Sequence, residues 1–260
     1  MAGFPGKRPI SPTRCAPPSE PPAGRAEAHP ERRGGQLYGR RKGRALNPRQ
    51  EAALERLLPG LRVPLAPDGR AGVTLAPEAL FTPPPREVWL EIGFGAGEHL
   101  IAQAEAHADV GLIGCEAFRE GVGKLVRTVE LAGLANVRVH AGDAREVIAA
   151  LPDGALSRAF LLFPDPWPKA RHHKRRFIAP ETGAGLARTL RPGAELRVAT
   201  DWPDYLRWTL LHVLRHPDFD WPATTPADWR ARPADWPETR YERKAHRAGR
   251  SCFYLRFLRR

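Results

Sequence analysis

The chain has 260 residues, 42% of them hydrophobic, and carries 41 lysines and arginines against 29 aspartates and glutamates. This length accommodates one substantial domain with extensions, and the sequence has no apolar run near the roughly 20 residues that span a bilayer. Three widely spaced cysteines form neither a disulfide framework nor a metal knot, which favours a reducing cytoplasm. The net charge of +12 favours a nucleic-acid partner, with a solubilising surface and basic tail as the alternative.

The first 36 residues are rich in Pro, Gly, Arg and Glu and have almost no large apolar side chains. Such a segment buries too little surface to offset the entropy of ordering, so we expect residues 1–36 to be a disordered tail. It also lacks the apolar stretch of a secretory signal. Residues 37–260 are then expected to form one folded domain with a basic, helical N-terminal extension.

The extension begins with the basic segment GRRKGR (39–44), a candidate RNA contact. A helix is predicted to start near Asn47, with Pro48 at its first position. Leu54 and Leu58 then lie on one apolar stripe of this helix, which indicates packing against a core.

From residue 87 onward, short apolar runs alternate with helical patterns. The predicted strands are 88–94, 110–117, 137–143, 157–165 and 194–201, and the predicted helices are 97–107, 119–134, 144–151, 179–190 and 202–216. This alternation is typical of a doubly wound α/β fold with a mostly parallel sheet. Near the C-terminus, SCFYLRF (251–257) reads as a strand after a turn at Ala248–Gly249, and we expect an antiparallel hairpin that closes the sheet edge.

The first predicted strand ends in a glycine-rich turn, where glycines allow close approach to a ligand. Gly93, Gly95 and Gly97 give the spacing G-x-G-x-G, and Glu98 stands where a dinucleotide fingerprint has its third glycine. Glu91 and Glu98 would surround a pyrophosphate with negative charge, so a cationic ligand fits better. S-adenosylmethionine, with a sulfonium and an ammonium group, is such a ligand.

Two further carboxylates follow the next two strands. Glu116 comes about 20 residues after the glycines, where a carboxylate takes a ribose diol in either a nicotinamide or an adenosylmethionine site. Asp143 is placed to accept from an adenine amino group or, alternatively, to cap the next helix. Acidic residues at three successive strand ends favour a cofactor site at this edge of the sheet.

The fourth strand breaks into PDPWPK (164–169), in which three prolines fix the backbone. Asp165, Trp167 and Lys169 together offer a carboxylate, an aromatic plane and a cation, which suit a nucleobase acceptor. The alternative is a turn that merely packs. The dense basic run 170–176 that follows favours the first interpretation.

Two more segments belong to the candidate acceptor site. Asp201 ends the fifth strand and either caps the helix that starts at Trp202 or contacts the acceptor. Residues 239–243 (TRYER) mix a hydroxyl, cations, an aromatic ring and a carboxylate, more than a solvated strand requires. The adjacent His172 and His173 have no further ligands at useful spacing, so no metal site is expected.

Together these segments resemble the bacterial tRNA (guanine-N7-)-methyltransferase family of the TrmB type. The resemblance covers residues 37–260, and its most specific part is FPDPWPKARHHKRRF (163–177). It implies a Rossmann-like class I methyltransferase fold with an antiparallel C-terminal strand. It also implies S-adenosyl-L-methionine as cofactor, S-adenosyl-L-homocysteine as product, tRNA as partner, guanosine 46 as target and a cytoplasmic location. No metal, membrane or obligatory protein partner is expected.

The resemblance also implies roles for individual residues. Asp165 is the expected catalytic residue. The expected cofactor-binding residues are Glu91, Gly93, Gly95, Gly97, Glu116, Asp143 and Asp165. The expected substrate-binding residues are Lys169, Asp201, Thr239, Arg240, Tyr241 and Glu242. The family often has Lys where this chain has Arg240, and a bidentate guanidinium alters the contacts available there.

Guanine N7 has an in-plane lone pair and no proton, so we expect Asp165 to hold the base and offset its developing charge rather than to remove a proton. Three other functions compete with this one. They are a methyltransferase for another acceptor, such as an exocyclic amine; a noncatalytic RNA-binding protein with a vestigial cofactor fold; and, disfavoured by Glu98, a nicotinamide-dependent oxidoreductase.

Overall fold

The computed structural model describes residues 45–65 and 75–260, all within the unit Gln36–Arg260. The expected tail (1–36) and the basic segment 39–44 lie outside the described residues and stay predictions. A helix that could cross a membrane is absent from the described part of the chain.

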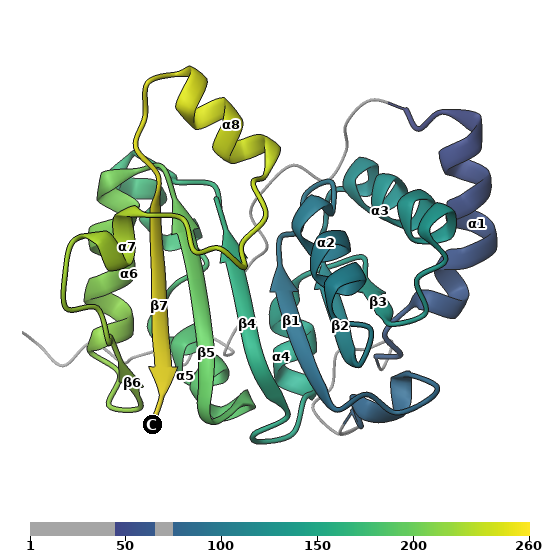
Figure 1. Cartoon of the computed structure of the whole chain (residues 1–260), viewed down its shortest axis with the longest axis horizontal. Coiled ribbons are helices and arrows are strands. Elements are labelled where there is room, and N and C mark those ends of the chain that lie inside the picture. The colour runs from purple at the N-terminus through teal and green to yellow at the C-terminus, as the bar shows by residue number, and fades with distance from the viewer. Residues whose placement is uncertain (1–44, 66–74) are drawn as a thin grey trace, which may run out of the picture. The chain divides into compact units, whose positions relative to one another are not determined.

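A seven-stranded sheet organises the described residues, in the order β3-β2-β1-β4-β5-β7-β6 (Figure 1). The strands are β1 (Glu87–Ile92), β2 (Val110–Cys115), β3 (Val137–His140), β4 (Leu156–Leu162), β5 (Leu190–Thr200), β6 (Phe219–Asp220) and β7 (Phe253–Arg259). The first five run parallel, and β7 pairs antiparallel with both β5 and β6. This confirms the expected doubly wound, mostly parallel α/β fold.

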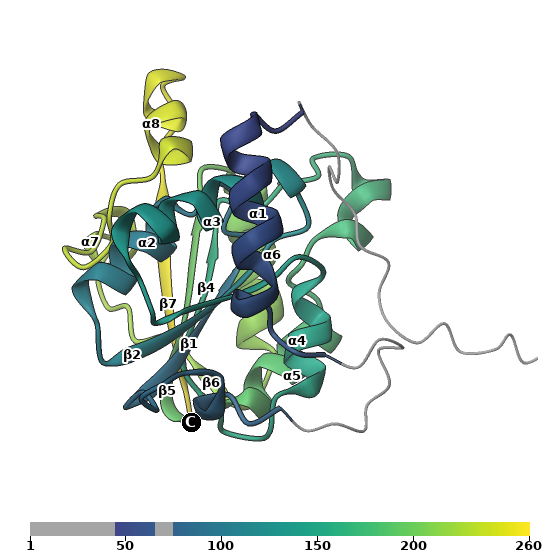
Figure 2. The same cartoon turned by 90° about the vertical axis from the view of Figure 1, so that its right-hand side faces the viewer.

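Helices cover both faces of the parallel strands. The described helices are α1 (Pro48–Leu61), α2 (Glu98–Ala106), α3 (Arg119–Ala132), α4 (Ala144–Ala150), α5 (Pro180–Thr189), α6 (Pro203–Leu214), α7 (Ala227–Arg230) and α8 (Arg240–Arg247), with 3-10 turns at Glu78–Leu80 and Ala170–Arg175; α8 lies beyond the carboxyl ends of the strands (Figure 1). Figure 2 shows α2 and α3 on one side of the sheet and α4 and α5 on the other.

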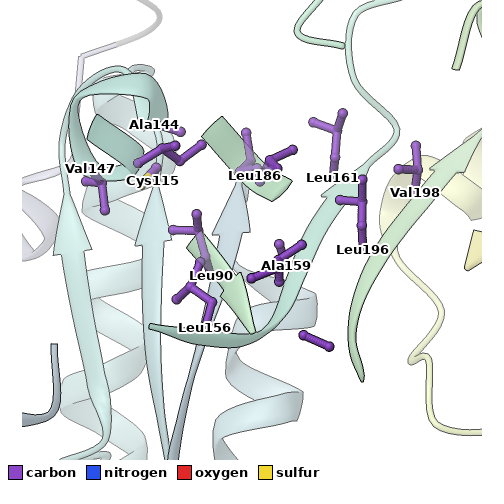
Figure 3. Close-up of a cluster of buried hydrophobic side chains, with 14 of the residues drawn as sticks. Leu90, Cys115, Ala144, Val147, Leu156, Ala159, Leu161, Leu186, Leu196 and Val198 are labelled. Atoms are coloured by element: carbon purple, nitrogen blue, oxygen red, sulfur yellow. The ribbon is translucent and has the colours of Figure 1, made fainter. Parts of the chain in front are cut away.

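Alternate residues of one strand feed two separate cores. Trp89 packs with α1, α2 and α3, whereas Leu90 packs with α4, α5 and α6, and both side chains are buried. Figure 3 shows the second core, where Leu90, Leu161 and Leu196 lie on neighbouring strands. Because both faces are covered, β1, β2 and β4 consist mostly of apolar residues, which is why their positions were predictable.

The N-terminal helix forms as its sequence predicts. Asn47 Oδ1 accepts from the Gln50 amide at 2.9 Å, and the Asn47 amide donates to Gln50 Oε1 at 3.2 Å. This capping box satisfies two otherwise unpaired donors, and Pro48 occupies the first turn without losing a bond. Leu54 and Leu58 are buried against α3, as expected.

The expected C-terminal hairpin is wrong in two respects, because its first strand is absent from the described residues and because β6, not β7, forms the edge of the sheet. The residues before the Ala248–Gly249 turn form the helix α8, and β7 pairs with β5 and β6 instead of with them. Thr239 caps this helix, since its Oγ1 accepts from the Glu242 amide at 3.3 Å. Glu242 and Ala245, three residues apart, are the buried positions, a helical rather than an alternating spacing.

Candidate functional site

A cleft of about 510 Å³ opens where the parallel strands end. The ends of β1, β2 and β4 and the loops after them supply its walls, together with the start of α3 and residues Arg240 and Tyr241 of α8. This volume lies within the range of roughly 300–1,000 Å³ found for small-molecule sites. Its position at the carboxyl ends of the strands is the one that open α/β sheets use for ligands.

The loop after β1 takes a backbone path that glycine favours. Gly93, Gly95 and Gly97 have φ of 72°, 59° and 85°, in the left-handed region. The first turn of α3 comes so close that a Cβ on Gly121 would lie 2.0 Å from the Gly95 carbonyl oxygen. The loop is therefore pressed between α3 and the cleft, with its backbone on the cleft wall.

Glu116 ties this loop to the end of β2. Its two carboxylate oxygens accept from the amides of Gly95 and Phe118, each at 2.8 Å. Burial raises the pKa of the Glu116 carboxyl, and the nearby Asp165 charge raises it further. A carboxylate has about four acceptor positions, so Glu116 keeps capacity for ligand hydroxyls on the cleft wall.

Asp143 lines the cleft and caps α4. Its Oδ1 accepts from the Arg145 amide at 3.0 Å, and its Oδ2 pairs with the Arg145 guanidinium at 2.9 Å. The helix cap that the sequence left as an alternative is thus present. An adenine amino group would have to share Oδ2 with Arg145.

Glu91 lies beside the cleft and not on its wall. It is 4% exposed and faces a second cavity of about 20 Å³ next to the glycine loop. Its Oε2 is 2.7 Å from His99 Nδ1, and the other ring nitrogen is 3.3 Å from Gln103 Nε2. Gln103 also donates to the Asp235 carbonyl at 2.8 Å. The sequence does not predict this buried series of hydrogen-bonded side chains; the i, i+4 spacing of His99 and Gln103 is its only sequence signal.

The proline-rich loop after β4 has a strained backbone. Phe163 and Trp167 have φ of 50° and 43°, a conformation that costs non-glycine residues about 1–3 kcal/mol each. Between them, Asp165 is exposed on the cleft wall and forms no hydrogen bond or ion pair with the residues that the structure describes. Trp167 also lines the cleft, where the Arg175 guanidinium lies 4.8 Å from its ring centroid.

Two residues of α8 reach the cleft. The Tyr241 ring lies over the glycine loop, where a Cβ on Gly95 would be 3.1 Å from its Cε2. Arg240 donates its amide to Glu98 Oε2 at 2.5 Å, and its guanidinium lies 4.8 Å from the Tyr241 ring centroid. The start of α8 is therefore anchored to the start of α2.

The other expected substrate-binding residues lie away from the cleft wall. Thr239 borders the small cavity, and Glu242 is buried, accepting from Tyr254 and pairing with Arg232 at 3.1 Å. Lys169 is exposed just beyond the lining residues. Asp201 accepts from Arg250 Nε at 2.7 Å.

Two sequence-based interpretations change in the structure. Asp201 does not cap α6; the Trp202 amide instead donates to Thr200 Oγ1 at 3.2 Å. The basic run 170–176 is not uniformly exposed, because Arg176 is buried. A basic stretch in a sequence does not reveal which cation turns inward.

One group of side chains among the described residues has spacing suited to a metal ion. Glu238, Glu242 and His246 bring ligand atoms within 4.8 Å of one another on and before α8. Glu242 already accepts a hydrogen bond from the Tyr254 hydroxyl, so this group helps to hold α8 in place.

A mostly parallel sheet with a glycine-rich first loop and carboxylates after β2, β3 and β4 defines a Rossmann-like class I methyltransferase. Residues 85–255 match the model of a family described as "Putative methyltransferase". The chain is 54% identical over 224 residues to the tRNA (guanine-N(7)-)-methyltransferase of Rhodospirillum rubrum, covering 86% of this chain and 88% of that one. It is 50% identical over 236 residues to the enzyme of that name from Ruegeria pomeroyi, covering 88% and 97%. The chain belongs to the tRNA (guanine-N(7)-)-methyltransferase family.

Comparison with solved structures concerns the fold. The protein PH0851 superposes with a TM-score of 0.50 at 18% identity, and the match covers 67% of this chain and 43% of that chain. This likeness supports the arrangement of the sheet and its helices and carries nothing about the substrate.

Proposed function

We propose that this protein transfers a methyl group from S-adenosyl-L-methionine to guanine N7 in tRNA, releasing S-adenosyl-L-homocysteine. The name shared by its relatives supports tRNA as substrate. The family resemblance further suggests guanosine 46 and a cytoplasmic enzyme that needs no metal or protein partner. The observation that carries the proposal is Asp165, a carboxylate on a strained loop at the cleft that has no hydrogen-bond or ion-pair partner among the described residues.

The cleft suits a cationic donor. Its acidic residues include Glu116 and Asp165, and neither carboxylate has a cationic partner among the described side chains. A bound S-adenosyl-L-methionine supplies an electrophilic methyl group on a sulfonium. Glu116 would hold the ribose hydroxyls, Asp143 the adenine amino group, and the backbone of Gly93 to Gly97 the methionine chain attached through the sulfonium. Glu91 would face the amino-acid end from its small cavity.

Asp165 would act on the acceptor base. Guanine N7 presents a lone pair, so the N–CH₃ bond forms as the S–CH₃ bond breaks and no proton leaves. The demands on the protein are alignment and compensation of the positive charge that the base acquires. A carboxylate that accepts from the guanine N–H groups does both, and Trp167 and Tyr241 offer aromatic faces for stacking.

The RNA backbone would follow the exposed cations beside the cleft. Lys169, Arg171 and Lys174 are exposed, and Arg240 lines the cleft. Each phosphate contact would steepen the dependence of affinity on salt. The remaining expected substrate-binding residues would act indirectly. Asp201 would position Arg250, and Thr239 and Glu242 would position α8.

The test is methylation of an unmodified tRNA transcript with labelled donor, followed by identification of the modified nucleoside. We expect 7-methylguanosine from the wild type and a loss of at least a hundredfold in kcat for Asp165→Asn, the scale of one lost electrostatic contact. Asp153→Asn is the matched control, because Asp153 is exposed, precedes the start of β4 far from the cleft end of that strand, and pairs with Arg188 of α5. A different methylated nucleoside would refute the substrate, and full activity of Asp165→Asn would refute the role of that residue.

A further inference from the structure

Two adjacent arginines at the end of the basic run lie on opposite sides of the proline-rich loop. Arg175 lines the cleft and covers the Trp167 ring. The Arg176 side chain is 0% exposed and lies behind the loop. Arg175 therefore faces the cleft, whereas Arg176 faces the protein interior.

Arg176 holds the loop by its carbonyl groups. Its Nε donates to the Pro166 carbonyl at 3.0 Å, and its Nη2 is 3.4 Å from the Trp167 carbonyl. Nη2 also forms an ion pair with Asp204 on α6, and the guanidinium lowers the pKa of that carboxyl. The guanidinium lies 4.9 Å from the Trp208 ring centroid, so it joins the loop to α6.

The loop can form few hydrogen bonds within itself. Pro164, Pro166 and Pro168 have no N–H, so they donate no backbone hydrogen bond. Phe163 and Trp167 adopt left-handed backbone conformations, which persist only where the surroundings fix them. Donors must therefore come from outside the loop, and Arg176 supplies them with a rigid planar group.

We infer that Arg176 is a positioning residue for methyl transfer, which fixes the backbone around Asp165 and Trp167 without touching either substrate. The inference rests on the proposed function. Asp165 directly precedes Pro166, so release of the Pro166 carbonyl moves the carboxylate. A displacement of about 1 Å in an active site reduces the rate about a hundredfold. RNA affinity is unchanged, because a buried guanidinium meets no phosphate.

The experiment uses the full chain with unmodified tRNA and S-adenosyl-L-methionine. Arg176→Met keeps the length of the side chain and removes its donors; Arg176→Lys keeps a charge and some donors. We expect kcat to fall about a hundredfold for the Met variant and by an intermediate factor for the Lys variant. KM for tRNA and its slope against salt should stay at the wild-type values. Asp204→Asn, which loosens the same guanidinium, should lower kcat in the same direction.

Two controls separate positioning from other roles. Lys174→Gln, which removes one of the exposed cations beside the cleft, should raise KM for tRNA and flatten the salt slope. Leu54→Ala, in the α1 core, should lower the melting temperature while kcat stays unchanged.

The inference is overturned if the Arg176 variants keep the wild-type kcat, or if they raise KM and flatten the salt slope like Lys174→Gln. It is also overturned if Leu54→Ala and the Arg176 variants lose the same fraction of kcat for the same decrease in melting temperature. If Arg176→Met does not fold, Arg176→Lys and Asp204→Asn decide by the same criteria. Wild-type protein that methylates no tRNA refutes the proposed function instead, a result that is distinct from all of these.

Discussion

A single methyl group added to Gly121 is expected to displace the glycine loop. The Cβ of Gly121→Ala would lie 2.0 Å from the Gly95 carbonyl oxygen, where side-chain carbons are normally at least 3.0 Å from such an atom. Either the loop or α3 must therefore move by about 1 Å, enough to cost about a hundredfold in an active site. Overpacking of this kind costs about 1–3 kcal/mol, and the better helix propensity of Ala returns about 1 kcal/mol.

The measurements are donor affinity by titration calorimetry, thermal unfolding, and the methylation rate. We expect weaker donor binding and a lower melting temperature, with a shift of about 2–4 °C for each kcal/mol lost. Gly183→Ala is the matched control: it is also a helical glycine, but no atom lies within 4 Å of the added carbon. That variant should gain about 0.5–1 kcal/mol and bind the donor normally. Wild-type donor affinity in Gly121→Ala would refute the reasoning.

Three further predictions concern titratable groups. Since burial raises the pKa of Glu116, acidification should weaken donor binding at a higher pH than for an ordinary glutamate, and Glu116→Gln should abolish that dependence in calorimetric titrations. Burial raises the pKa of Cys115 well above its usual value and that of Cys252 to about 11, so a Cys15→Ser variant should react with a thiol reagent only after unfolding; fast native labelling would contradict this. Desolvation and neighbouring cations lower the pKa of His172, so phosphate contact should favour its protonation and tRNA affinity should rise as the pH is lowered into the acidic range; an identical pH profile for His172→Gln would contradict this.

The sequence predicts the parallel sheet and the glycine loop because local chemistry dictates both. Strands covered on two faces are mostly apolar, and a turn through left-handed conformations favours glycine. The predicted strand ends, 143 and 165, lie three residues beyond the observed ends, 140 and 162, because the loop residues that follow begin with an apolar side chain, Ala141 and Phe163, which extends the strand pattern. Local pattern thus locates each element better than it locates its boundary.

The parts that sequence did not predict depend on tertiary contacts. The segment 240–247 is so polar that its helix is apparent only from its anchors, Thr239 and the Glu98 carboxylate. Arg176 belongs to a uniformly basic run, so its sequence context does not distinguish it from its neighbours. It is buried because it donates to the carbonyl groups of Pro166 and Trp167, in a loop that has few donors of its own. A charge pattern gives the number of cations in such a run but not their directions.

The position of β7 has a consequence for synthesis on the ribosome. This strand is made after every other strand of the sheet, yet it lies between β5 and β6, and β6 pairs with it alone. Until β7 emerges, β5 exposes an unpaired edge and Phe219 of β6 has no sheet to join, which is a hazard for association between chains. The cleft side, built from β1 to β4, precedes it in the chain. Nascent protein should therefore acquire a donor pocket before it acquires a complete sheet, and chaperones that shield strand edges would act in that interval.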